Sequence, residues 1–313
     1  WEGVDIMNLF VSKDEEIVRT KGRLRDKNFI YKTRKEAIDL NIPLVILVGR
    51  NSASASEIVC GSAQDLDRAV IIGERTYGKG LVQNVIPLSF NSQLKVTIAK
   101  YYIPSGRCIQ AIDYSHKDQE GNALQVNDSL LETFYTRKGR LVHDGRGIKP
   151  DLLFSPKELS EITSTLLQKY MIFDFATQYR LSHDSILAPD QFEITDQIWE
   201  DFIGFLGDKD ISYQSDLEKS LEKLKKEMEE SGLTDDMSQV CLQIQDKINQ
   251  KKENELELHK EEISRVLKTE LVSRYYFNRG IIIANLYADG AIEKAMEVIK
   301  DETVYNEILE AIK

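Results

Sequence analysis

The sequence contains few of the residues on which metal, disulfide and redox chemistry depend. Of its 313 residues, only three are cysteine and four are histidine. They are scattered along the chain: Cys60, Cys108, Cys241, His116, His143, His183 and His259. No C-x-x-C pair and no H-E-x-x-H spacing occurs, so the sequence predicts neither a zinc site nor a redox dithiol. We expect the cysteines to be small buried hydrophobic residues.

Positive charge and long apolar runs are scarce as well. The chain has 41 lysines and arginines against 52 acidic residues, a net charge of −11, and its isoelectric point is near 5.1. This balance argues against a nucleic-acid-binding protein, which normally presents a basic face. No apolar stretch approaches the roughly 20 residues that a membrane-spanning helix requires. The chain shows no signal peptide, but it begins at Trp1 rather than methionine, so this says nothing about compartment.

The chain has enough hydrophobic residues to form the cores of two domains. Hydrophobic residues make up 42% of the chain, and domains usually contain about 100–200 residues. The composition changes near residue 155, from β-branched runs with glycine-bearing turns to amphipathic helical patterns. We therefore expect one domain at residues 1–154 and a second at residues 155–313.

The first part has the pattern of an α/β domain. The continuous apolar run at 43–49 is typical of a strand covered on both faces. A helix is expected from Ser54 to Asp67 and a second buried strand at 69–73. Another β-rich run follows Lys79, and residues 94–103 alternate as in a half-exposed antiparallel strand.

The second part is expected to be wholly helical. One apolar stripe runs from Lys157 to Leu181, Thr195 and Ser215 are expected to cap the next two helices, and an amphipathic segment extends from Thr234 to Tyr276. Three aromatic residues of the helix after Thr195 should pack against other helices: Trp199, Phe202 and Phe205.

The stretch "GERTYGKGLVQ" (73–83) places Lys79 between two glycines. Its spacing is close to that of a phosphate-binding P-loop, which suggests a nucleotide site. A P-loop, however, continues with Ser or Thr and opens a helix. Here Gly80 and a β-rich run follow, so the nucleotide hypothesis is weak.

A serine-rich turn, "SASASE" (52–57), joins the first predicted strand to the first helix. A nucleophile fits such a turn, because backbone N–H groups at a helix N-terminus can stabilise an oxyanion. The alternative is structural, because Ser54 and Glu57 form a capping-box pattern. If Ser54 is a nucleophile it needs a base, and Lys79 can serve if desolvation lowers its pKa. Gln83 lies on the same side of a strand as Lys79 if the pleat starts at residue 79, and it could then orient the amine.

Three longer stretches of the sequence resemble a known family. "SASASEIVCGSAQDLDRAVIIGERTYGKGLVQ", "LKVTIAKYYIPSGRCIQ" (94–110) and "GRGIKPD" (145–151) are similar to the catalytic segments of the C-terminal processing peptidases, or tail-specific proteases. The resemblance covers about half of the chain. It implies a serine endopeptidase of the periplasm, thylakoid lumen or another extracytoplasmic compartment.

The resemblance also implies site residues and a fold. Ser54 matches the nucleophile, Lys79 the general base and Gln83 the residue that positions it, while the Ala55 N–H would be one oxyanion donor. An active arrangement would bring Ser54 Oγ and Lys79 Nζ within roughly 2.6–3.2 Å. The core is expected to be a partial crotonase/ClpP-like α/β fold followed by an all-helical domain. No metal or organic cofactor is implied.

The sequence departs from the family pattern at the N-terminus of the chain. Family members carry a PDZ domain that binds the substrate C-terminus and a glycine-rich turn that supplies a second oxyanion donor, and both would precede Trp1. We therefore expect an N-terminally truncated catalytic core whose full protein acts on protein or peptide substrates with apolar or unstructured C-termini.

Two alternatives remain open. The helical half could be a non-catalytic interaction or dimerisation module, in which case a homo-oligomer is expected. A Ser-His-Asp hydrolase using His143 and Asp144 is disfavoured, because the G-x-S-x-G elbow is missing.

Overall fold

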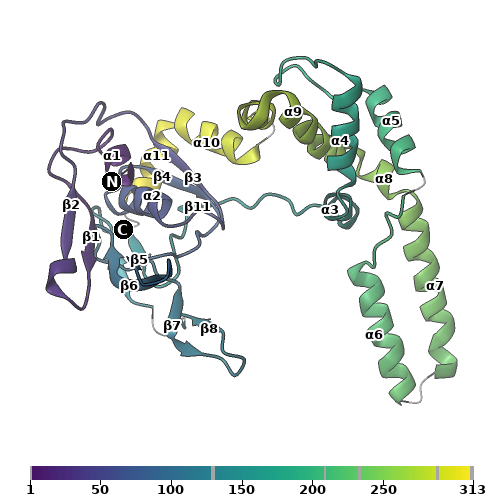
Figure 1. Ribbon diagram of the computed structural model, residues 1–313, viewed down its shortest axis with the longest axis horizontal. Helices are drawn as coiled ribbons and strands as arrows, with labels where there is room; N and C mark the ends of the chain where they lie inside the picture. Colours follow the sequence, from purple (N-terminus) through teal and green to yellow (C-terminus); the bar gives the residue numbers. More distant parts are fainter. Residues whose placement is uncertain (1, 128–130, 208, 232–233, 287–288, 311–313) are drawn as a thin grey trace. The chain divides into compact units, whose positions relative to one another are not determined.

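The computed structural model describes residues 2–310 apart from 128–130, 208, 232–233 and 287–288 (Figure 1). The chain divides into two compact units, one of Trp1–Pro156 with Gly290–Lys313 and the other of Lys157–Asp289. The first unit is an α/β structure and the second is helical, as the sequence predicts. The predicted boundary at 154/155 lies within two residues of the first structural one. It differs from the structure in assigning residues 290–313 to the helical domain.

The elements of the first unit are, in chain order, α1 (Glu2–Met7), β1 (Glu16–Lys21), the 3-10 turn η1 (Arg25–Lys27), β2 (Phe29–Lys32), β3 (Val45–Val48), α2 (Ala55–Asp65), β4 (Val70–Gly73), β5 (Leu81–Pro87), β6 (Gln93–Tyr102), β7 (Ile112–Lys117), β8 (Ala123–Gln125), β9 (Thr133–Tyr135), β10 (Leu141–His143), β11 (Leu152–Leu153), α10 (Gly290–Lys300) and α11 (Glu302–Leu309). The predicted strands at 43–49 and 69–73 correspond to β3 and β4, and the helix predicted between them to α2.

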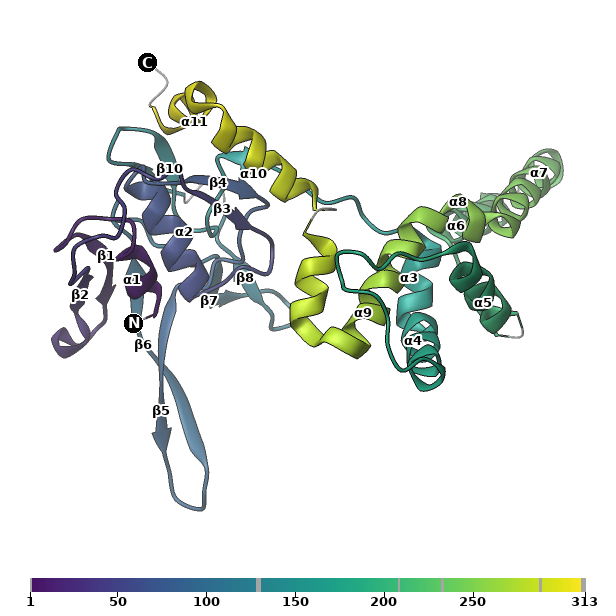
Figure 2. The same ribbon diagram turned by 90° about the horizontal axis from the view of Figure 1, so that it is seen from above.

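A parallel sheet of order β11-β4-β3 forms the centre of this unit. Helix α2 lies on one of its faces and the α10–α11 pair on the other (Figure 2). Side chains alternate along β4 as they must in a strand. Ile71 joins the cluster that contains Cys60 of α2, whereas Val70 and Ile72 pack with Val298 of α10.

This second apolar face explains why α10 and α11 belong to the first unit. Without them, the side chains of Val70 and Ile72, which are fully buried, would face water. The covering helices come from the far end of the chain, and the local pattern of residues 290–313 gives no sign of which surface they cover.

A second sheet is antiparallel, with the order β2-β1-β6-β5. Its β5–β6 hairpin extends away from the parallel sheet and the helices that cover it (Figure 2). These two strands confirm the β-rich run predicted after Lys79 and the antiparallel strand predicted at 94–103. Because β5 begins at Leu81, the hairpin carries the Lys79 turn at its base.

The helical unit comprises α3 (Glu161–Gln168), α4 (Met171–Ser182), α5 (Asp196–Leu206), α6 (Asp216–Ser231), α7 (Thr234–Glu253), α8 (Glu255–Leu258) and α9 (Lys260–Asn285). Trp199 and Phe202 of α5 are buried and Phe205 is partly buried in a core that also takes side chains from α3, α4 and α9. The predicted packing of these rings is confirmed. Thr195 caps α5 by accepting the Ile198 N–H at 3.3 Å.

Two segments with a predicted helical pattern are interrupted in the structure. The segment from Lys157 to Leu181 forms α3 and α4, because Tyr170 adopts a left-handed conformation with φ of 59°. After this break the buried side chains are those of Ile172 and Phe175, whereas Phe173, which belongs to the predicted stripe, is 50% exposed. The segment from 234 to 276 is divided into α7, α8 and α9.

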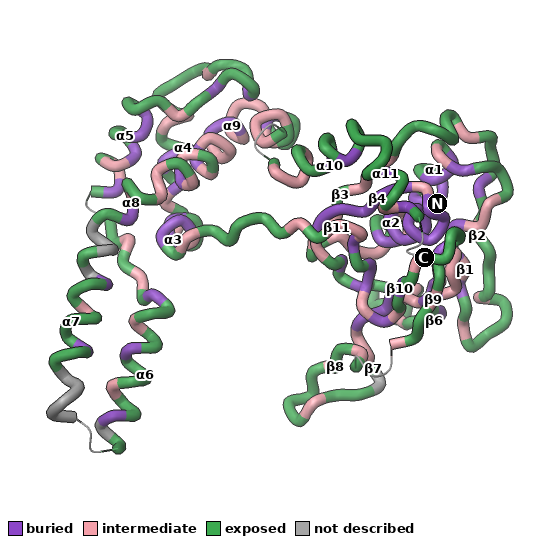
Figure 3. Tube along the Cα trace, turned by 180° about the vertical axis from the view of Figure 1, so that it is seen from behind, coloured by how far each residue is buried: buried purple, intermediate pink, exposed green. Residues whose placement is uncertain are grey.

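Helices α6 and α7 form a hairpin with a small core of its own. The predicted cap is present, because Ser215 Oγ accepts the Glu218 N–H at 3.2 Å. Buried residues lie where the two helices meet (Figure 3), in a cluster of Leu221, Met228, Cys241 and Ile248. Among the described residues, no helix is both long and apolar enough to cross a bilayer.

Candidate active site

Ser54 occupies a strained turn between β3 and α2. Its φ of 59° and ψ of −117° lie in a region that residues with a side chain rarely adopt, and such strain persists only where the surroundings enforce it. The predicted capping box with Glu57 is present, and the Ser54 N–H donates to the Glu57 carboxylate at 2.9 Å. The half-buried Ser54 is therefore both a helix cap and a strained, accessible hydroxyl.

The Glu57 carboxylate joins the serine turn to the lysine turn. It is fully buried and accepts hydrogen bonds from Thr76 Oγ1 at 2.5 Å, from the Gly78 N–H at 2.6 Å and from the Lys79 N–H at 2.8 Å. Charge-assisted bonds of this kind are about twice as strong as neutral ones. With the bond from Ser54, one side chain fixes the two candidate catalytic turns beside each other.

Lys79 departs from a turn that requires glycine. Gly78 has a φ of 83°, and a Cβ there would lie 2.4 Å from the Ala111 Cβ. On the other side of Lys79, the Gly80 N–H donates to Gln110 Oε1 at 2.7 Å. The sequence hypothesis that these glycines let the backbone carry the amine toward Ser54 is consistent with this close packing.

The Lys79 side chain itself is exposed. Across the described part of the chain, its ammonium group forms no hydrogen bond or ion pair, so the expected hydrogen bond between Ser54 Oγ and Lys79 Nζ is not made in this structure. The main chains are brought together by Glu57, whereas the amine still points into solvent.

Gln83 lies on β5 and Ala55 at the N-terminus of α2. Gln83 is exposed on β5 opposite Thr97, immediately after a shift in the β5–β6 register at Val82. That irregularity interrupts the simple pleat that would align Gln83 with Lys79. The Ala55 N–H, at the first position of α2, donates to no group in the described ranges and remains available to an incoming oxygen.

Sequence reasoning missed three residues that support this site. Glu57 was interpreted only as a capping residue, and Thr76 and Tyr101 were not singled out. A single bond to a helix-cap N–H does not compensate for burying a carboxylate, so the burial of Glu57 indicates further hydrogen-bond donors around it. The bonds from the lysine turn come from residues about 20 positions away, which no local pattern reveals.

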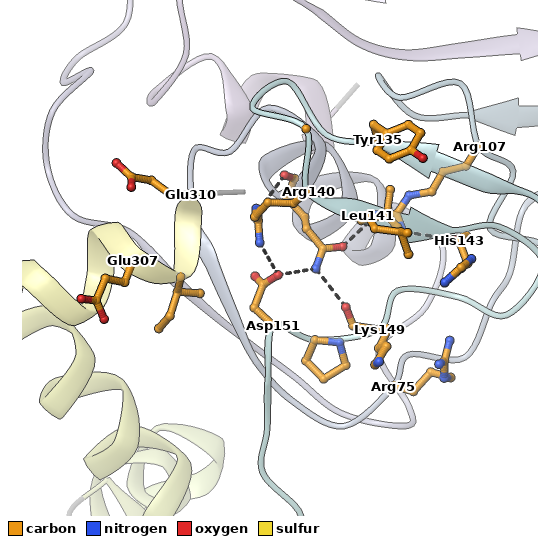
Figure 4. Close-up of a pocket in the computed structure, with 15 residues that line it drawn as sticks. Arg75, Arg107, Tyr135, Arg140, Leu141, His143, Lys149, Asp151, Glu307 and Glu310 are labelled. Carbon is orange, nitrogen blue, oxygen red and sulfur yellow. Dashed lines mark hydrogen bonds and ion pairs between the residues drawn. The ribbon is translucent and has the colours of Figure 1, made fainter. Parts of the chain in front are cut away.

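A cavity lies elsewhere in this unit. It encloses about 640 Å³ and contains neither Ser54 nor Lys79 in its walls. Arg140 in its wall binds Asp151 at 2.6 Å (Figure 4), and it also binds Asp67 at 2.7 Å. Asp151 also accepts from Gln64 at 2.8 Å. Asp151 is the last residue of the "GRGIKPD" segment, so these bonds hold that segment in place. We therefore assign the ionic network a structural role.

The alternative chemistries gain no support from the geometry. His143 lines that cavity, while the Asp144 carboxylate accepts the Glu132 N–H at 2.9 Å; neither residue joins the serine turn. No group of three or more potential metal ligands occurs among the residues that the structure describes. Cys60 and Cys241 are buried and Cys108 is partly buried, all as free thiols.

Comparison with known proteins agrees with the predicted family. Residues 1–117 match peptidase family S41, and residues 162–299 match the family described as probable PDZ-protease, C-terminal helical domain. The first part of the chain is thus similar to peptidase family S41. The resemblance to C-terminal processing peptidases is thereby confirmed, as is the combination of an α/β core with a helical domain.

Several relatives carry names of this type. The chain is 41% identical over 111 residues to a carboxy-terminal-processing protease of Bartonella bacilliformis, a match covering 36% of this chain and 25% of the relative. It is 41% identical over 114 residues to the chloroplastic C-terminal processing peptidase of Tetradesmus obliquus, covering 36% and 24%. A solved photosystem II D1 C-terminal processing protease is 30% identical, with coverage of 50% and 32% and a TM-score of 0.36. The chain thus matches about a quarter of the length of these curated relatives.

Proposed function

We propose that this chain carries the catalytic part of a serine endopeptidase that works through a Ser54–Lys79 dyad. The observation that carries the proposal is the buried Glu57 carboxylate, which binds the main chain of both residues and so fixes a strained serine beside a glycine-flanked lysine. The match of residues 1–117 to a peptidase family supports the reaction class.

The dyad would act through proton transfer between the two side chains. The neutral Lys79 amine takes the proton of Ser54 Oγ as that oxygen attacks the scissile carbonyl carbon. The Ala55 N–H donates to the resulting oxyanion. The Lys79 ammonium then gives its proton to the leaving amine, and the same amine activates the water that cleaves the acyl-enzyme. Gln83 orients the amine and transfers no proton.

Assembly of the dyad would require the Lys79 side chain to rotate toward Ser54. Glu57 already holds the main chains of both turns, and side-chain torsions change far more readily than a packed backbone. Cover over the exposed amine would also favour its neutral form. We infer that bound substrate, or further residues of the full-length protein, supplies this cover.

The proposed substrates are proteins with apolar or unstructured C-termini, and the proposed location is extracytoplasmic, both from the family resemblance. The alternative of a helical interaction module loses its main support, because Trp199 and Phe202 are buried within the helical unit and form no exposed aromatic patch.

Site-directed variants of the full-length protein test this function. Ser54→Ala, Lys79→Ala and Lys79→Arg should each lower kcat on an unstructured substrate with an apolar C-terminus by roughly 10³-fold or more, because the dyad acts as a unit. The arginine variant fails because a guanidinium stays protonated and cannot accept the serine proton. Melting temperatures should change little.

Ser56→Ala is the matched control, because Ser56 lies in the same turn and is exposed. It should keep nearly full activity. Near-normal turnover by the Lys79→Arg enzyme would refute the dyad and leave Ser54 as a helix cap.

A further inference from the structure

Tyr101 lies behind the turn that carries Lys79. It is the penultimate residue of β6 and only 5% exposed. Its N–H donates to the Gly80 carbonyl at 3.0 Å, and its hydroxyl donates to the Lys79 carbonyl. One residue therefore binds two successive carbonyl groups at the point where the Lys79 side chain leaves the backbone.

The hydroxyl of Tyr101 is committed to this bond. Burial raises the pKa of Tyr101 to about 12, so the phenol keeps its proton. A phenol has one proton to donate, and Tyr101 gives it to the Lys79 carbonyl.

The bond from Tyr101 complements those made by Glu57, because Glu57 accepts the Lys79 N–H whereas Tyr101 donates to the Lys79 C=O. The peptide that carries the lysine is thus held on both its donor and its acceptor side.

We propose that Tyr101 is a positioning residue of the Ser54–Lys79 pair, which sets the orientation of the lysine backbone. The inference rests on the proposed peptidase function. Tyr101 is not a base in this scheme, since its proton is committed to a carbonyl. Its effect is on geometry, to which reaction rates are sensitive at the scale of about 1 Å.

The test is Tyr101→Phe in the full-length protein, which removes the hydroxyl and keeps the ring. Tyr102→Phe is the matched control, because Tyr102 is the next residue of the same strand and its ring lies 4.7 Å from the Lys21 ammonium. Steady-state kcat and KM on an unstructured substrate with an apolar C-terminus are measured beside the melting temperature of each variant.

We expect Tyr101→Phe to lower kcat roughly 10- to 100-fold with KM within about twofold of wild type, and Tyr102→Phe to leave both unchanged. The loss should persist at temperatures where thermal unfolding shows the variant fully folded. A kcat equal to wild type, or one that recovers whenever the variant is fully folded, would assign Tyr101 a purely structural role and overturn the inference.

Ser54→Ala, run in parallel, separates this inference from the function on which it rests. Cleavage that survives Ser54→Ala would overturn the proposed function and this inference together. Cleavage that is lost in Ser54→Ala and retained in Tyr101→Phe would overturn the role of Tyr101 alone.

Discussion

At the scale of single residues, Ser54 has a backbone conformation that is unfavourable for a residue with a side chain. Ser54 is held with φ of 59° and ψ of −117°, a conformation that costs a residue with a Cβ about 1–3 kcal/mol. Glycine would adopt it without that cost. Keeping serine there makes sense if its hydroxyl is needed, because a helix cap alone could be supplied by an unstrained residue.

This strain predicts a difference between two inactive variants. Ser54→Gly and Ser54→Ala both lose the hydroxyl, but only glycine relieves the backbone. We expect Ser54→Gly to be more stable than Ser54→Ala by about 1 kcal/mol, measured by chemical denaturation. Equal stabilities, or a less stable glycine variant, would show that the turn is not strained in solution.

Glu57 is the residue whose loss should affect both folding and chemistry. In Glu57→Gln, one of the two acceptor oxygens becomes an NH₂ group that faces the N–H donors of Ser54 and Lys79. Leaving buried donors without acceptors costs about 1–3 kcal/mol each, so we expect a lower melting temperature and a large loss of kcat.

Thr76→Ser is the control for this position, because it keeps the hydroxyl that donates to Glu57. It should retain most of the activity and stability. A Glu57→Gln enzyme with wild-type kcat and melting temperature would contradict the role given to this carboxylate.

At the scale of elements, α2 presents its buried face to β4 and carries Cys60 on that face. Burial raises the pKa of the Cys60 thiol to about 12, so at pH 8 the thiol stays protonated in the folded protein. Because the thiolate is the reactive form, the reactivity of Cys60 reports whether α2 is packed as described.

Cys60 should therefore resist iodoacetamide at pH 8 in the native protein and react rapidly in denaturant. Peptide mapping by mass spectrometry measures both states. Rapid native alkylation of Cys60, at the rate found in denaturant, would mean that α2 does not pack against the sheet.

Most of these elements could be predicted from periodicity, but not their breaks or their partners. The run at 43–49 and the capping residues Thr195 and Ser215 gave the positions of a strand and two helices. Tyr170 lies between α3 and α4 in a left-handed conformation although tyrosine has no preference for it, and apolar residues occur on both sides of it. Such a break is set by tertiary packing, which a single sequence does not display.

At the scale of the whole molecule, the end of the chain completes the first unit. Val298 of α10 is 2% exposed and packs on the β4 face formed by Val70 and Ile72. The Tyr305 hydroxyl of α11 accepts the Leu44 N–H at 2.9 Å. The α/β core therefore depends on residues that the sequence pattern assigned to the helical domain.

Two substitutions on α10 test this arrangement. Val298→Asp buries an unpaired charge and should destabilise the first unit by about 3 kcal/mol or more, whereas Met296→Asp, at a position that is 47% exposed, should be tolerated. Calorimetry combined with limited proteolysis shows which unit opens. Early cleavage confined to residues 157–289 in Val298→Asp would place α10 with the helical unit instead.

Only part of the candidate site could be predicted from the sequence. Ser54 and Lys79 stand in motifs long enough to match a family, so their roles were predicted directly. Glu57 and Tyr101 act by joining segments that are distant in sequence, and their contacts emerge only once α2, the Lys79 turn and β6 are placed together.

The most direct test of the account is covalent labelling of the nucleophile in the full-length protein. A serine-reactive fluorophosphonate, followed by peptide mapping, should modify Ser54 and no other serine of the turn. Labelling should be lost in Lys79→Ala and Lys79→Arg. Absence of label on Ser54 in protein that cleaves its substrate, or unchanged labelling in Lys79→Arg, would contradict the Ser54–Lys79 dyad.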